Sequence, residues 1–156
     1  MIRAIAFCAF LAVPGAAIAA CPGPDGVTGA AMTGTWQVGI SAANVNAVPM
    51  LGGTNEVVLQ GSGSGVTLVL DGRRIALART EAIFDWKAGT GAAVSASQAA
   101  LLFGCDFADM TKWQGKMTAD GDVVIWRILA LNGREAVLHW SLSGVVQAQG
   151  MFHITR

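Results

Sequence analysis

Apolar and polar positions alternate along several stretches of the chain and predict short β-strands. Trp36, Val38 and Ile40 are separated by single residues, which places all three on one side of a strand. A second short strand is predicted over residues 56–60. Residues 42–54 between them carry no charge and no regular period, so they predict a long loop.

The most regular local signal is a hairpin centred on Asp71-Gly72. Residues 66–70 and 73–79 flank this dipeptide, and Asp-Gly suits a two-residue turn in which both residues have positive φ. Such a turn places Leu68 opposite Ile75 on the apolar face. The turn chemistry and the apolar pattern therefore predict the same register.

The character of the chain changes after this hairpin. Alternation continues over residues 82–87 and predicts a further strand that contains Trp86. Residues 92–103 are instead rich in alanine and end at Gly104, a residue type that commonly follows a helix. They predict the single short helix of the chain.

The C-terminal third predicts a meander of four strands, over residues 113–119, 122–131, 134–142 and 150–156. Asn132-Gly133 predicts a two-residue hairpin between the second and the third. This hairpin sets the side of each strand that faces the core, because a shift of one residue inverts both faces.

In the register of that hairpin, Ile125 lies opposite Trp140 and Trp126 points outward, where the predicted helix would cover it. The expected inner face comprises Val123, Ile125, Leu129, Ala136, Leu138, Trp140 and Leu142.

The preceding connection is predicted to be a three-residue loop, Ala119-Asp120-Gly121, with a glycine bulge. A two-residue turn would direct Lys116 to the expected inner face. The longer loop instead turns Trp113 and Met117 inward.

Short antiparallel strands with one helix indicate a mainly β fold, either a small antiparallel β-barrel or a strongly curved meander sheet. The chain is expected to divide into a signal peptide over residues 1–20, an extended lead-in rich in glycine and proline over 21–31, and a single β-domain over 32–156.

The N-terminus has the three parts of an export signal. Arg3 supplies the positive charge, residues 4–13 form an apolar run, and residues 16–20 offer small side chains for cleavage. The run is about half of the roughly 20 residues that a membrane-spanning helix needs. We therefore expect a periplasmic or extracellular protein without a membrane span.

The residue after this signal has two competing interpretations. Cys8 leaves with the signal, so Cys21 and Cys105 remain as an even pair in an oxidising compartment, which favours a disulfide. Residues 18–21 also resemble a bacterial lipobox, which would make Cys21 the lipidated N-terminus of a membrane-anchored lipoprotein. Lipidation would leave Cys105 without a partner.

Charge and residue clusters exclude several function classes. Removal of the signal leaves 9 basic residues (10 minus Arg3) against 10 acidic ones, and no basic cluster indicates nucleic-acid binding. No catalytic triad, carboxylate pair or cofactor motif is evident, so neither an enzyme nor a cofactor is expected.

The two histidines are a possible metal site. If Trp140 faces Phe152 across the last hairpin, His139 lies opposite His153 on the outer face. Because only Glu135, at the far hairpin end, is available as a third ligand, ordinary surface histidines are the favoured interpretation.

Three inward tryptophans, Trp36, Trp113 and Trp140, are the candidate binding residues. Large aromatic side chains in such positions often simply fill a core. Alternatively, they line an apolar cavity, because barrels of this size can hold one small ligand.

Gly34-Thr35-Trp36, close to the mature N-terminus, resembles the calycin group, which comprises lipocalins, fatty-acid-binding proteins and avidins. The lipocalin resemblance implies that the tryptophan closes the base of a barrel and that a late arginine, Arg127 or Arg156, packs over it. Gln37-Val38-Gly39-Ile40 departs from the avidin pattern and the chain has no tyrosine, so biotin is not the expected ligand.

The sequence thus predicts an exported, non-enzymatic β-domain that binds either a small apolar ligand or a protein partner. The alternative is a structural or accessory envelope protein that is anchored through a lipid on Cys21.

Overall fold

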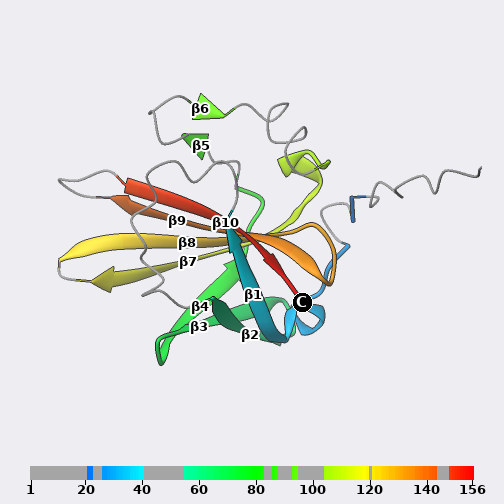
Figure 1. The fold of residues 1–156 in the computed structure, drawn as a ribbon, viewed down its shortest axis with the longest axis horizontal. Coiled ribbons are helices and arrows are strands. Elements are labelled where there is room, and N and C mark those ends of the chain that lie inside the picture. Colours follow the sequence, from blue (N-terminus) through cyan, green and yellow to red (C-terminus); the bar gives the residue numbers. More distant parts are fainter. Residues whose placement is uncertain are drawn as a thin grey trace, which may run out of the picture.

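The chain folds into a closed barrel of eight antiparallel strands (Figure 1). The computed structural model describes residues 21–22, 26–40, 55–82, 86–87, 93–94, 104–119, 121–143 and 148–156. Each barrel strand pairs with the next one along the chain, and the last pairs with the first. The predicted barrel is therefore confirmed. The strands are β1 (Gly34–Ile40), β2 (Glu56–Ser62), β3 (Gly65–Leu70), β4 (Arg73–Arg79), β7 (Thr111–Ala119), β8 (Asp122–Ala130), β9 (Glu135–Ser143) and β10 (Ala148–Thr155).

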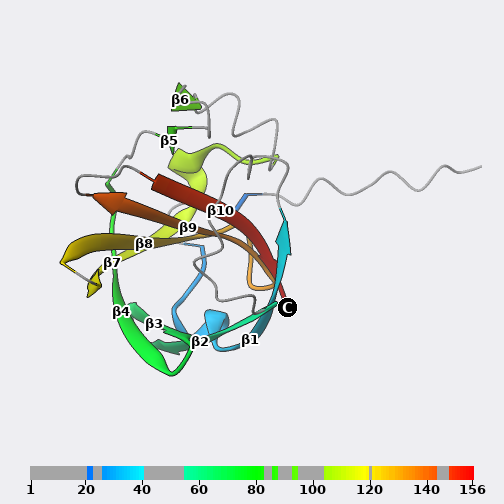
Figure 2. The ribbon, with the colours of Figure 1, turned by 60° about the vertical axis from the view of Figure 1, so that its left-hand side comes forward.

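The remaining elements are short. The 3-10 turns η1 (Ala30–Met32) and η2 (Phe107–Asp109) precede β1 and β7. Strands β5 (Trp86–Lys87) and β6 (Ala93–Val94) pair with each other outside the barrel, on the side of β9 and β10 in both views (Figures 1 and 2). Among the described residues, no helix has the length and apolar character for a membrane crossing.

Two predictions for this region need correction. The expected helix over residues 92–103 is wrong at its start, because β6 occupies Ala93–Val94; residues 95–103 lie outside the described residues. The strand expected over residues 82–87 is confirmed only at β5, since Ala82 is not in a strand and residues 83–85 are not described. The loop expected over residues 42–54 and the export signal expected over residues 1–20 also lie outside the described residues.

The β3–β4 hairpin has the predicted register. Leu68 pairs with Ile75, and both side chains are buried. Asp71 and Gly72 adopt φ angles of 47° and 76°, the positive values that this type of two-residue turn requires.

The connection from β8 to β9 is one residue longer than predicted. The Asn132 side-chain oxygen accepts hydrogen bonds from the backbone N–H groups of Arg134 (2.7 Å) and Glu135 (2.9 Å). The Leu131 N–H donates to the carbonyl of Glu135 at 2.9 Å and closes a three-residue loop. The asparagine side chain thus stabilises a wider turn than its Asn-Gly sequence indicates.

This extra residue inverts the predicted faces of β8. Trp126, not Ile125, lies opposite Trp140, and Trp126 is fully buried inside the barrel. The prediction that Trp126 points outward beneath a helix is therefore wrong. The residues of β8 that face the barrel core are Val124, Trp126, Ile128 and Ala130.

The connection from β7 to β8 also differs from its prediction. Ala119 pairs with Asp122, so the turn has two residues and not three. Trp113 and Met117 nevertheless contact the barrel core, as predicted. Both connections of β8 differ from their predictions by one residue. The two errors cancel for β7, whose inward side chains are therefore the predicted ones.

A row of four paired residues crosses the interior of β7 to β10. Gly115 pairs with Trp126, Trp126 with Trp140, and Trp140 with Gly150. A Cβ atom at position 150 would lie 2.8 Å from Cε2 of the Trp140 indole and closer still to its Nε1. Gly150 leaves the space that the Trp140 indole occupies, as expected where glycine interrupts a strand beside a bulky neighbour.

We expect Gly150→Ala to lower the free energy of unfolding by about 1–3 kcal/mol, because the indole that it meets is fully buried and has no room to move. Urea unfolding followed by circular dichroism measures this loss. Gly133→Ala is the matched control, since nothing lies within 4 Å of a Cβ at that position. Equal stability of the two variants would contradict the tight packing of the row.

Candidate functional site

Four tryptophans fill the interior of the barrel. Trp36, Trp113, Trp126 and Trp140 each have 0% exposure and come from four different strands. The inward orientation predicted for three of them is confirmed. The other large side chains that are fully buried in the barrel are Met32, Leu59, Leu68, Ile128, Leu138 and Ile154. This packing favours a core role for the tryptophans over that of a cavity wall.

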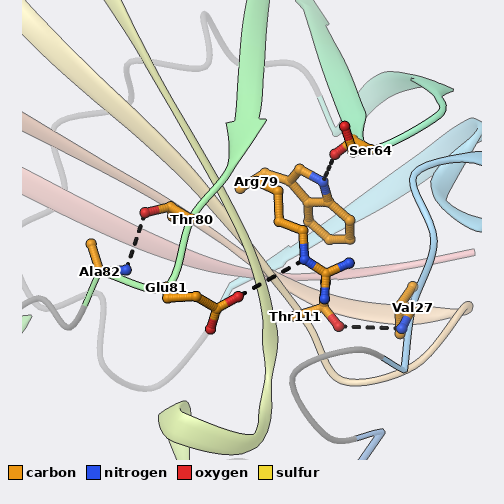
Figure 3. A network of polar contacts seen from close by, with 8 residues as sticks. Val27, Ser64, Arg79, Thr80, Glu81, Ala82 and Thr111 are labelled. Atoms are coloured by element: carbon orange, nitrogen blue, oxygen red, sulfur yellow. Dashed lines mark hydrogen bonds and ion pairs between the residues drawn. The ribbon is translucent and has the colours of Figure 1, made fainter.

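The four indoles differ in hydrogen bonding. The Trp36 Nε1–H donates to the Met32 carbonyl at 2.9 Å. The Trp113 Nε1–H donates at 2.8 Å to the carbonyl of Ser64, which is labelled in Figure 3. The buried Nε1–H groups of Trp126 and Trp140 have no hydrogen-bond partner among the residues that the structure describes. A buried donor without a partner typically costs about 1–3 kcal/mol, so the Trp126–Trp140 pair is an unfavourable polar feature within an otherwise apolar core.

Arg156 covers the outer side of Trp36. Its guanidinium carbon lies 5.6 Å from the centroid of the indole, within the range of a cation–π interaction. The same guanidinium donates to the carbonyls of Thr33 and, at 3.0 Å, of Gly133. Gly34 has φ +149°, and a Cβ there would lie 2.9 Å from Cδ of Arg156. Of the two arginines predicted to pack over Trp36, Arg156 is therefore the one that does so.

We expect Arg156→Ala to lower the free energy of unfolding by about 1–3 kcal/mol, through loss of the cation–π contact and of two charge-assisted hydrogen bonds. Arg156→Lys keeps the charge but lacks the planar guanidinium that reaches both carbonyls. The stability of the lysine variant should therefore lie between that of the parent and that of Arg156→Ala. Thermal unfolding checks the order. An alanine variant as stable as the parent would show that this end of the barrel closes without Arg156.

Arg127 organises a polar network on the outer face of β7 to β9. Its Nε donates to Gln114 Oε1 at 2.8 Å, and one of its terminal nitrogens donates to Ser141 Oγ at 3.0 Å. That nitrogen also lies 3.1 Å from Nδ1 of His139, which must accept because a guanidinium has no acceptor. Burial lowers the pKa of Arg127 from its ordinary value. The network escaped prediction because it depends on the corrected β8–β9 register.

The two histidines do not form the predicted pair. His139 lies opposite Met151 and His153 lies opposite Val137, because the β9–β10 register is shifted by two residues from the predicted one. Within the part of the chain that the structure describes, no group of three His, Cys, Asp or Glu side chains is arranged to hold a metal ion.

The predicted disulfide between Cys21 and Cys105 is present, with an S–S distance of 2.07 Å. It joins the lead-in to the segment that precedes η2. A hydrogen bond of 3.2 Å from the Val27 N–H to Thr111 Oγ1 is a second attachment, which connects the lead-in to the start of β7 (Figure 3). Both cysteines belong to a small apolar cluster outside the barrel, whose other members are Met110, Leu129, Leu131, Val137 and Met151.

The ladder of paired residues between β4 and β7 is the shortest in the described barrel. Only Ala78 with Gln114 and Arg79 with Trp113 are paired, whereas every other pair of neighbouring strands shares at least four residue pairs. The two strands run in different directions from this point (Figure 1). We refer to residues 73–77 of β4 and 115–119 of β7, which share no residue pair, as the β4–β7 seam.

Comparison with protein-family models, with curated proteins and with solved structures finds no match to this chain.

Proposed function

We propose that this chain is an exported, non-enzymatic binding domain that recognises a protein partner through its outer surface. The observation that carries the proposal is the filled barrel: its four interior indoles have no accessible surface. A packed core of this kind acts as a rigid scaffold. Two shallow hollows of the described residues lie on the outside, one beside Arg156 and one over β1 to β3.

The disulfide supports export without a lipid anchor. Disulfides persist mainly in oxidising compartments, which agrees with the signal expected over residues 1–20. The sulfur of Cys21 is bonded to Cys105. One sulfur atom does not carry both a thioether to a lipid and a disulfide, so this bond favours a free periplasmic or extracellular domain over a lipoprotein.

We retain the resemblance to the calycin group as part of this proposal. Closed eight-stranded up-and-down barrels are typical of lipocalins, and the packing of Arg156 over Trp36 agrees with the contact that the resemblance implies. The proposed function differs from ligand transport because the tryptophans occupy the space in which a ligand would lie.

A small apolar ligand inside the barrel is the competing proposal. The unpartnered Nε1–H groups of Trp126 and Trp140 favour it, because a ligand with an oxygen acceptor would satisfy them. Such a ligand would have to displace side chains that are now in contact.

Titration of the mature chain with cis-parinaric acid, a fluorescent apolar fatty acid, separates these proposals. We expect no energy transfer from tryptophan to the probe, and native mass spectrometry should give the mass of the protein alone. A stoichiometric complex of the unmodified chain with the fatty acid would overturn the outer-surface proposal.

A further inference from the structure

The β4–β7 seam begins where a glycine replaces a side chain. A Cβ at position 115 would lie 2.7 Å from Cδ2 of Leu77 and closer still to the carbonyl oxygen of Ala76. That carbonyl therefore lies against Gly115, next to Lys116, the residue that a continued ladder would pair with Ala76. The regular pairing of the two strands ends at this contact.

On both sides of the seam, alternate residues direct their backbone N–H and C=O groups toward it, away from the ladders of β4 with β3 and of β7 with β8. The Thr80 N–H donates to the Lys112 carbonyl at 3.0 Å, and hydrogen-bonded positions recur at every second residue of an antiparallel ladder. On β4 the positions directed into the seam are therefore Ala76 and Arg74. On β7 the corresponding positions are Lys116 and Thr118. These residues pair with β3 or with β8 on their other side, and among the described residues no strand pairing involves their seam side.

The side chains along the seam differ between its two faces. Arg74 and Lys116 are exposed on the outer face, and the Arg74 guanidinium is bonded to the neutral side chain of Gln60 at 2.7 Å. On the inner face, Ile75 is buried and Met117 packs against the barrel core. The seam is thus basic on the outside and apolar on the inside.

We propose that the β4–β7 seam binds an extended segment of a partner protein by β-strand addition, and that this segment alternates apolar and acidic residues. The main chain of the segment pairs with the unpaired edge of β4 or β7. Its side chains alternate between the two faces, so that acidic residues lie near Arg74 and Lys116 and apolar residues lie near Met117. The inference rests on the proposed function, since it identifies where the partner binds.

The probe is a fluorescein-labelled heptapeptide of alternating valine and glutamate, titrated with the complete mature chain. We expect a saturable rise in fluorescence anisotropy that weakens with added salt. A valine–lysine heptapeptide and a valine–glutamate heptapeptide with N-methylated valines should each bind at least tenfold more weakly, the first through charge repulsion and the second through loss of backbone donors.

Charge reversal on the protein tests the location. Arg74→Glu and Lys116→Glu should each weaken binding of the acidic peptide at least tenfold, and both are surface changes that leave the core intact. Arg134→Glu is the matched control, because this exposed arginine lies in the β8–β9 connection and not at the seam. Its affinity should equal that of the parent.

Three results would overturn the proposal that the seam binds a partner: absence of acidic-peptide binding, equal binding of the acidic and basic peptides, or unchanged affinity in both seam variants. If one of these results is found and the barrel also excludes cis-parinaric acid, only the binding site at the seam is refuted. The proposed binding of a partner through the outer surface then still stands. A barrel that binds the fatty acid would refute that function whatever the peptide does.

Discussion

Replacement of both disulfide cysteines, as Cys21→Ser with Cys105→Ser, is expected to lower the free energy of unfolding by about 4–5 kcal/mol. The bond closes a loop of 84 residues, and the chain-entropy model gives this magnitude for a loop of that length. Native domains are stable by only about 5–15 kcal/mol. The expected loss is therefore between about a third and nearly all of the net stability of such a domain.

The lead-in explains why this loss is not confined to the N-terminus. Val27 and Met32 follow Cys21 and are buried in the barrel core, where Met32 also accepts the hydrogen bond of Trp36. Once the disulfide is absent, the bond between Val27 and Thr111 is a remaining tether of this segment.

Urea unfolding of the oxidised chain, the reduced chain and the double variant measures the effect. The reduced chain and the variant should lose similar stability, which separates loss of the bond from any effect of serine. A loss below about 1 kcal/mol in both would contradict the role assigned to the disulfide.

Replacement of tryptophan by phenylalanine should divide the four interior indoles into two classes. Trp36→Phe is expected to cost about 2–4 kcal/mol, through a small cavity and the loss of the hydrogen bond to Met32. Trp140→Phe creates a similar cavity but removes a buried donor that has no partner, so the two effects largely offset each other. Its stability should lie within about 1 kcal/mol of the parent.

The remaining two tryptophans are the matched tests of this division. Trp113→Phe should behave like Trp36→Phe, since its indole donates to Ser64, and Trp126→Phe should behave like Trp140→Phe. Far-ultraviolet circular dichroism follows the unfolding independently of indole fluorescence. Equal losses in all four variants would show that the hydrogen-bond difference does not determine the stability of the core.

Local patterns predicted the elements better than they predicted the faces of the strands. The Asp71-Gly72 hairpin has its predicted register because the turn and the apolar pattern agree. The Asn132-Gly133 hairpin does not, because the side chain of Asn132 accepts two backbone N–H groups and stabilises a three-residue loop. A single added residue then moved Trp126 from the outside to the inside.

One signal in the sequence pointed to the correct register of β9 and β10. Gly150 lies inside β10, and a glycine inside a strand often marks the close approach of a bulky neighbour. Had Gly150 been matched with Trp140, this pair would have set the register of the last two strands. Turn chemistry alone does not contain that information.

The β4–β7 seam and the Arg127 network were beyond prediction for a different reason. β4 and β7 are separated along the chain by the segment that contains β5, β6 and η2, so no hairpin turn sets their register. The partners of Arg127 lie on β7 and β9 and meet only in the folded sheet. Both features depend on tertiary pairing, which no local pattern specifies.

The filled barrel is the central claim, and exchange of the indole N–H protons with solvent tests it most directly. Two-dimensional ¹H–¹⁵N spectra of the protein with ¹⁵N-labelled tryptophan, recorded after transfer to D₂O, follow each indole separately. We predict that the indole protons of Trp36, Trp113, Trp126 and Trp140 exchange only through global unfolding, because all four are fully buried. Exchange of the Trp126 and Trp140 protons within minutes under native conditions would reveal a solvent-accessible interior and contradict the claim.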